Sequence, residues 1–156
     1  DGEHIQHVFA TNSAGFMNTG AMRSEFSGHN FGVPFQFLSI TDTYNDGCGI
    51  MLLHNSATKV YGKNVMDRLK EASEIWHTMD KFGADTAAFT GYWQEGCPAR
   101  ADTDGVLVSA WSKPGATLAV AVNMTGQPQK AAVTCMGETR EIEIAPMKPV
   151  FMQFNK

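Results

Sequence analysis

Charge is scarce in this 156-residue chain. Charged residues make up 18% of it and the net charge is −4, whereas about a quarter of the residues are charged in typical globular proteins. The twelve Lys and Arg residues are scattered, although nucleic-acid binding needs them clustered on one face. No apolar run is long enough to span a membrane as a helix. We therefore expect neither nucleic acid nor a membrane as a partner.

Cysteine is also sparse. The three cysteines are Cys48, Cys97 and Cys135, so at least one thiol lies outside any disulfide within the chain. Their spacing contains no CxxC motif and no zinc-binding pattern. Two interpretations stay open: three buried thiols that pack as small hydrophobic groups, or a Cys48–Cys97 disulfide, since both residues stand beside glycines.

Several signatures of catalysis and targeting are missing as well. The sequence contains no Gly-rich phosphate loop, no nucleophile elbow and no Cys–His protease signature. His4 and His7 have no carboxylate or cysteine in register with them, so they do not indicate a metal site. A signal peptide is absent too, as it would be from a mature or truncated chain. We predict neither a metal nor another cofactor.

The sequence changes in character near Gly105. Residues 1–104 mix loops, apolar runs and one amphipathic segment, whereas residues 105–156 alternate short apolar runs with Gly/Pro turns. Strands and a helix in the first part indicate an α/β layer, and evenly spaced short strands in the second indicate an antiparallel sandwich. We therefore predict an α/β segment over 1–104 and a small antiparallel β-sandwich over 105–156.

Three strands and one helix are predicted in the α/β segment. The strands are HIQHVFA (4–10), PFQFLSI (34–40) and GIMLLH (49–54), the last apolar on both faces as in a covered parallel sheet. The helix starts after Asn64, a potential N-cap, and stops at Gly83. Its predicted core stripe shows three- and four-residue spacing and consists of Val65, Leu69, Ala72, Trp76 and Met79.

The predicted sandwich strands are separated by Gly and Pro turns. AAFTGYW (87–93) is a short strand that runs into an aromatic turn, and EGCPARADTDG (95–105) is a polar connector. The strands that follow are VLVSAW, TLAVAVN, KAAVTC, REIEI and PVFMQF. Asn123-Met124-Thr125 matches a glycosylation sequon, but it also ends a strand at a Gly/Pro turn, and this turn is a sufficient explanation unless the source is eukaryotic.

A dense polar cluster, MRSEFSGHN (22–30), precedes the strand at 34–40. It contains Arg23, Glu25, His29 and Asn30, and sugar sites combine such carboxylate, amide and cationic groups with aromatic platforms, for which Trp93 is a candidate. The alternatives are a structural loop with a local Arg–Glu pair, and a Trp93 that packs at the junction of the two parts.

Three motifs together resemble a known family. They are LLHN (52–55), FTGYW (89–93) and VLVSAWSKPGATLAVAVN (106–123). The chain resembles the C-terminal end of bacterial glycoside-hydrolase-like proteins with a (β/α)8 barrel and a β-sandwich, and most of all relatives of the β-N-acetylgalactosaminidase family. The resemblance implies that the α/β segment contains late barrel strands and one long helix. Because a barrel needs about 250 residues, most of it would lie outside this chain.

The resemblance also implies a function, the C-terminal portion of a glycoside hydrolase acting on glycans. Its partners would be carbohydrate and the missing N-terminal part of the same polypeptide, and it would be secreted or periplasmic. Within this chain we predict a catalytic role for Glu25 and substrate binding by Arg23, His29, Asn30, His54 and Trp93. His54 would lie at the C-terminal end of a barrel strand, where barrel active sites lie.

Two other functions stay open. One is a non-catalytic carbohydrate-binding or structural module, which exposed aromatic residues on one sheet face would favour. The other is a subunit that pairs with a separate catalytic chain.

Overall fold

The computed structural model describes residues 8–9, 36–39, 44–60 and 64–156 of the chain. Their C-terminal part folds into two antiparallel sheets that face each other, as predicted for a small β-sandwich. The four-stranded sheet has the order β10-β7-β6-β4 and the three-stranded sheet the order β5-β8-β9. The strands are β4 (Ala88–Thr90), β5 (Ala99–Ala101), β6 (Val106–Lys113), β7 (Ala116–Asn123), β8 (Gln129–Cys135), β9 (Glu138–Ile144) and β10 (Pro149–Asn155).

Most of these strands match those predicted from the sequence, with two differences. β4 and β5 lie before Gly105, where the sequence placed the start of the sandwich, yet both belong to its sheets. β5 falls within the predicted polar connector, because a three-residue strand is too short to show a period-two pattern. The sandwich therefore recruits residues from the preceding part of the chain.

The four-stranded sheet is a middle layer buried on both faces. On one face Val108 and Ala121 contribute to the core between the two sheets. On the other face Trp111 and Leu118 belong to a second core, shared with the helices. Successive residues of a strand point to opposite faces, so β6 and β7 serve both cores at once. The three-stranded sheet and the helices thus pack against opposite faces of the four-stranded sheet.

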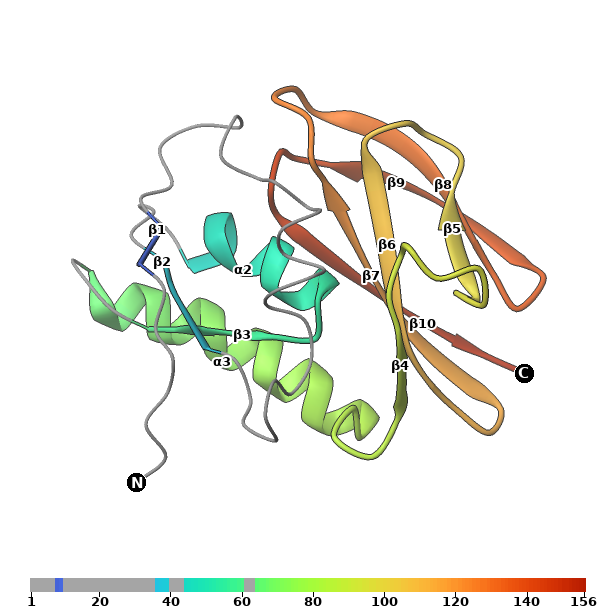
Figure 1. Cartoon of the computed structure of the whole chain (residues 1–156), viewed down its shortest axis with the longest axis horizontal. Helices are drawn as coiled ribbons and strands as arrows, with labels where there is room; N and C mark the ends of the chain where they lie inside the picture. Colours follow the sequence, from blue (N-terminus) through green and yellow to red (C-terminus); the bar gives the residue numbers. More distant parts are fainter. Residues whose placement is uncertain (1–7, 10–35, 40–43, 61–63) are drawn as a thin grey trace.

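The N-terminal part is an α/β layer. Three parallel strands have the order β1-β2-β3, and helices follow the second and third of them. Figure 1 shows α2 between the small sheet and the sandwich, and α3 running across the layer to end beneath β4. The elements are β1 (Val8–Phe9), β2 (Gln36–Ser39), α2 (Tyr44–Leu53), β3 (Ala57–Lys59) and α3 (Val65–Phe82).

The predicted strand GIMLLH is wrong, because residues 49–53 lie in helix α2. A short apolar run without polar interruptions does not distinguish a covered strand from a buried helix. Residues 48–53 of this helix are all buried, and they pack against β7, β10 and α3. A Cβ atom at Gly49 would collide with the carbonyl oxygen of Met147, so glycine allows α2 to lie this close to the sandwich.

The long helix was predicted with its correct limits, but its ends differ in detail. Gly83 closes α3 with φ 76°, and its N–H donates to the carbonyl oxygens of Met79 and Asp80. Asn64 stands at the N-cap with φ 58°, but its side chain makes no capping hydrogen bond. The predicted N-cap contact is therefore wrong, whereas the predicted stop at Gly83 is confirmed.

The buried face of α3 is rotated from the predicted stripe. It consists of Arg68, Ala72, Ile75 and Phe82. Trp76, which the periodicity placed in the core, is 42% exposed. Apolar residues cover more than half of the helix circumference, so periodicity alone did not show which part of that arc contacts α2.

The three cysteines are buried and form no disulfide. Cys97 and Cys135 lie in the core between the two sheets, whereas Cys48 lies in the core shared with the helices. Burial raises the pKa of the Cys97 and Cys135 thiols. The alternative Cys48–Cys97 bridge is therefore wrong, because the middle sheet separates its two residues.

Asn123 of the sequon is fully buried at the end of β7. Its Nδ2 donates to the carbonyl oxygens of Gln127 and Ile144 at 2.8 and 3.0 Å. Its Oδ1 accepts from the N–H and the hydroxyl of Thr125 at 2.8 and 2.7 Å. The contacts with Thr125 and Gln127 hold the turn after β7, and the contact with Ile144 joins this turn to the end of β9. The turn therefore explains this asparagine, as predicted.

Candidate functional site

Four of the six predicted site residues, Arg23, Glu25, His29 and Asn30, lie outside the described residues. The other two, His54 and Trp93, are 39 positions apart in the sequence and stack on each other, with ring centroids 5.2 Å apart and 18° between the planes. The structure therefore brings together two residues that were proposed separately.

His54 and Trp93 belong to an aromatic cluster between α2 and the sandwich. Tyr92 meets His54 edge-on at 5.6 Å, and Phe89 lies 6.4 Å from Trp93 and 5.3 Å from Trp111. A Cβ atom at Gly91 would collide with the Trp93 ring, which explains the glycine in the FTGYW motif. This motif folds the turn after β4 so that its aromatic rings pack at the junction.

Hydrogen bonds from β6 reinforce this junction. The Ser109 hydroxyl donates to the carbonyl oxygen of Leu53 at 2.8 Å and accepts from the N–H of Tyr92 at 3.0 Å. Trp111 Nε1 donates to Asn55 Oδ1 at 3.1 Å. Leu53 is the last residue of α2, so its carbonyl lacks a donor within the helix. The sandwich thus supplies the C-terminal contacts of α2 and joins it to the turn after β4.

The position of His54 differs from the prediction. Because residues 49–53 form a helix, His54 lies after α2 and just before β3, at the amino ends of the parallel strands. It is fully buried, and its Nδ1 lies 2.7 Å from the carbonyl oxygen of Ile50. Ligands of parallel α/β folds bind at the carboxyl ends of the strands. His54 therefore packs the junction on the opposite edge, and its placement at a strand C-terminus is wrong.

Trp93 is partly exposed. Its contacts with His54, Tyr92 and Phe89 agree with the alternative in which it packs at the junction. A role as a sugar platform stays a prediction.

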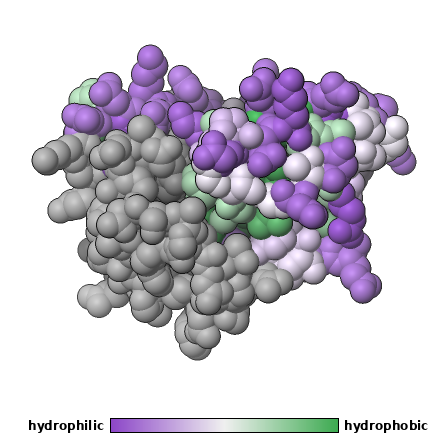
Figure 2. Space-filling model, turned by 90° about the horizontal axis from the view of Figure 1, so that it is seen from above, coloured by the Kyte–Doolittle hydropathy of each residue, from purple (hydrophilic) through white to green (hydrophobic). Residues whose placement is uncertain are grey.

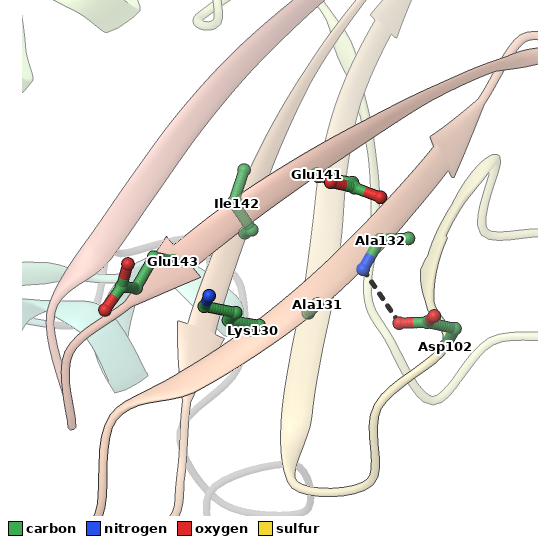
Figure 3. Close-up of a pocket in the computed structure, with 7 residues that line it drawn as sticks. All are labelled: Asp102, Lys130, Ala131, Ala132, Glu141, Ile142 and Glu143. Carbon is green, nitrogen blue, oxygen red and sulfur yellow. Dashed lines mark hydrogen bonds between the residues drawn. The ribbon is translucent and has the colours of Figure 1, made fainter.

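An open groove of about 380 Å³ lies over the outer sheet β5-β8-β9 (Figure 3). Asp102, Glu141 and Glu143 bring carboxylates to it, and Lys130 brings one ammonium group. Glu141 and Glu143 alternate with inward-facing isoleucines on β9, as predicted from the REIEI pattern. No aromatic side chain lines the groove, so it can hydrogen-bond to hydroxyl groups but gives a sugar ring no stacking surface.

Asp102 has a structural role in this groove. Its carboxylate accepts hydrogen bonds from the N–H of Ala132 at 2.8 Å and the hydroxyl of Thr103 at 2.9 Å. These bonds, the Ala132 N–H first, lower the pKa of Asp102 below its ordinary value. Figure 3 shows the carboxylate turned toward β8 along this bond. Asp102 therefore stays ionised in mildly acidic solution and fastens the end of β5 to β8.

Neither a membrane-spanning helix nor a metal-binding cluster occurs within the described residues. Neither α2 nor α3, the helices within the described residues, is long and apolar enough to cross a membrane. Within the same ranges no group of three or more His, Cys, Asp or Glu side chains is placed to hold a metal ion. In the view of Figure 2, hydrophilic side chains dominate the margins of the described surface and hydrophobic ones show between them.

The fold and the junction define a C-terminal β-sandwich module that is packed onto the last elements of an α/β layer. The family model described as glycoside hydrolase 123, C-terminal domain, matches residues 71–151, which is more than half of the chain. The chain therefore belongs to the glycoside hydrolase 123 C-terminal domain family. The match begins within α3 and ends in β10. A search among curated proteins finds no match.

Proposed function

We propose that this chain is the C-terminal portion of a glycoside hydrolase acting on glycans, in which it completes a (β/α)8 barrel and carries the β-sandwich. The observation that carries this proposal is the family match, which covers a C-terminal domain and begins in the helix of an α/β layer. The order β2-α2-β3-α3 with parallel strands is the repeating unit of such a barrel. Relatives of β-N-acetylgalactosaminidases are the group we expect it to join.

Two features, the free edge of β3 and the exposed apolar face of α3, support a partner for the α/β layer. Among the described strands β3 pairs only with β2, so its other edge is open to a further strand. The helix that follows exposes Val65, Met66, Leu69 and Trp76 by 48, 73, 43 and 42%. Parallel sheets are normally covered on both faces, and an exposed apolar helix face needs a neighbour. The partner we propose is the N-terminal part of the same polypeptide.

The chemistry in this proposal is shared between the two parts. The main pair of carboxylates that hydrolyses the glycosidic bond would belong to the N-terminal part. From this chain Glu25 would assist acid–base catalysis, and Arg23, His29 and Asn30 would bind the sugar. The sandwich would hold α2 and α3 in place from the edge opposite the site. A secreted or periplasmic location suits such an enzyme.

A carbohydrate-binding module without catalysis is less well supported. It would need aromatic side chains exposed on one sheet face. Within the described residues the exposed large hydrophobic side chains all belong to α3, and the groove over β8 and β9 has no aromatic lining.

The test starts from antibodies raised against the purified chain. They are used to isolate the native protein from the source organism. The mass of this protein is measured, and its activity is assayed on a panel of nitrophenyl β-glycosides that includes the N-acetyl-β-galactosaminide. We expect a species far larger than 17.0 kDa that cleaves at least one glycoside, and no cleavage by the isolated chain. A native mass of 17.0 kDa without activity would refute the proposal.

The proposed contact of α3 has its own test in the larger species. Trp76→Gln removes an apolar side chain from the exposed face, and His77→Gln changes its exposed neighbour outside that face. We expect Trp76→Gln to lower the Tm of the larger protein while His77→Gln leaves it unchanged. In the isolated chain the two variants should unfold alike, because Trp76 is already in contact with water there.

A further inference from the structure

Within the described part of the chain, Arg68 is a buried charge without a counter-charge. The residue is 4% exposed, although Asn64, Val65, Met66 and Asp67 just before it are exposed. Its Nε and Nη1 atoms are buried and have no hydrogen-bond partner. A guanidinium stays ionised in proteins, and leaving a buried charge uncompensated is strongly destabilising. Arg68 therefore lacks the anion that its burial requires.

The same turn of helix offers further donors. α3 is 18 residues long, and Asn64 at its N-cap makes no side-chain hydrogen bond to it. The first N–H groups of a helix have no acceptor within the helix, and they carry a partial positive charge. A side chain in the first turns of a helix points back toward its N-terminus. Arg68 lies in these first turns, so its guanidinium and the free N–H groups are donors of the same kind for an anion at this end of the helix.

The location agrees with a ligand site. Five residues separate the end of β3 from the start of α3, so the N-terminus of α3 lies at the carboxyl ends of the parallel strands. In Figure 1 it lies at the far side of the molecule from the sandwich. Ligands bind at this edge in parallel α/β folds. In this chain by itself residues 64–67 are exposed, so a dissolved ligand can reach this turn of the helix.

We propose that Arg68 and the N-terminal turn of α3 bind an oxyanion, the carboxylate or sulfate group of an acidic glycan. This inference rests on the proposed function, because it names the class of glycan that the enzyme would take. The planar fork of a guanidinium matches a carboxylate or sulfate through two parallel hydrogen bonds. Asp67 is the acidic residue of the same turn, but it is exposed, so water screens its repulsion of the ligand.

The experiment titrates the isolated chain by calorimetry with D-galacturonate and with sulfate, and with D-galactose as the neutral control at equal ionic strength. We expect galacturonate to bind more tightly than sulfate and galactose to give no signal. Arg68→Gln should weaken galacturonate binding by at least about tenfold, the effect of losing charge-assisted hydrogen bonds. Lys70→Gln removes an exposed charge from the same helix and should leave binding unchanged.

A second variant keeps the test valid if Arg68→Gln folds poorly. Arg68→Met retains the apolar stem and removes the charge. Without ligand it should raise the Tm above that of the wild type, because an uncompensated buried charge disappears. An arginine already satisfied within the protein would give a lower Tm instead.

Three results would overturn the inference. They are the absence of galacturonate binding, equal binding by Arg68→Gln and the wild type, and a lower Tm for Arg68→Met. Binding of sulfate without galacturonate would show an adventitious ion only and overturn the glycan ligand. None of these measurements uses hydrolysis, so a failure to bind galacturonate would leave the proposed function standing. If the native protein were inactive, the binding measurements would still test the anion site.

Discussion

Replacing Ser109 by alanine removes the hydroxyl group that joins the sandwich to the end of α2. Two hydrogen bonds disappear, one to the carbonyl oxygen of Leu53 at 2.8 Å and one from the N–H of Tyr92 at 3.0 Å. Each contributes about 1 kcal/mol net, and Ser109 is fully buried, so water cannot replace its hydroxyl group. We expect the free energy of unfolding to fall by about 2 kcal/mol, with a Tm lower by about 4–8 °C for a chain of this size.

Ser112→Ala is the matched control. Ser112 lies on the same strand, but its hydroxyl pairs only with that of Thr117 in a partly buried position, at 3.2 Å. We expect this variant to lose less than half as much stability in urea-induced unfolding followed by circular dichroism. Equal losses in the two variants would refute the conclusion that the sandwich supports α2 through Ser109.

Three further predictions concern the sandwich. Asn123→Ala should lower the free energy of unfolding, measured by urea titration, by about 2–4 kcal/mol, since it leaves buried partners unsatisfied. Asn155→Ala, at an exposed strand end, is the control and should change this free energy little. Asp102→Asn should be less stable than the wild type above the ordinary pKa of 3.8. Because folding lowers this pKa, the difference in stability between the two proteins should vanish as the pH falls through the folded value. A constant difference in acid would contradict the structural role of the Asp102 carboxylate. The Cys97 and Cys135 thiols, whose pKa burial raises, should react with a chromogenic disulfide reagent only after unfolding, and fast reaction of the native protein would show that they are accessible.

The sandwich was the part that local sequence patterns described best. The strands β6 to β10 have seven or eight residues each and are separated mainly by Gly/Pro turns, and each of these signals lies within a few neighbouring residues. In β9 the alternation of Glu141 and Glu143 with Ile142 and Ile144 already indicated which face is buried. The helix α3 was found for the same reason, because its periodicity and Gly83 are local.

The α/β part and the site were harder to read. Residues 49–53 are uniformly apolar, so nothing in their order distinguishes a strand from the helix that they form. That difference moved His54 from one edge of the sheet to the other. The partnership of His54 with Trp93 and the link from Ser109 to Leu53 join distant segments. No pattern in a single sequence reports contacts of this kind.

The sequence by itself determined most of the sandwich strands, the limits of the long helix and the resemblance to a glycoside hydrolase that the family match supports. Those features depend on composition and on neighbours along the chain. Only the tertiary structure decided which face of α3 is buried, that α2 is a helix packed on the sandwich, and that Arg68 is buried with its Nε and Nη1 atoms unpartnered. These depend on burial and on contacts between distant residues, which exist only once the layers have packed together.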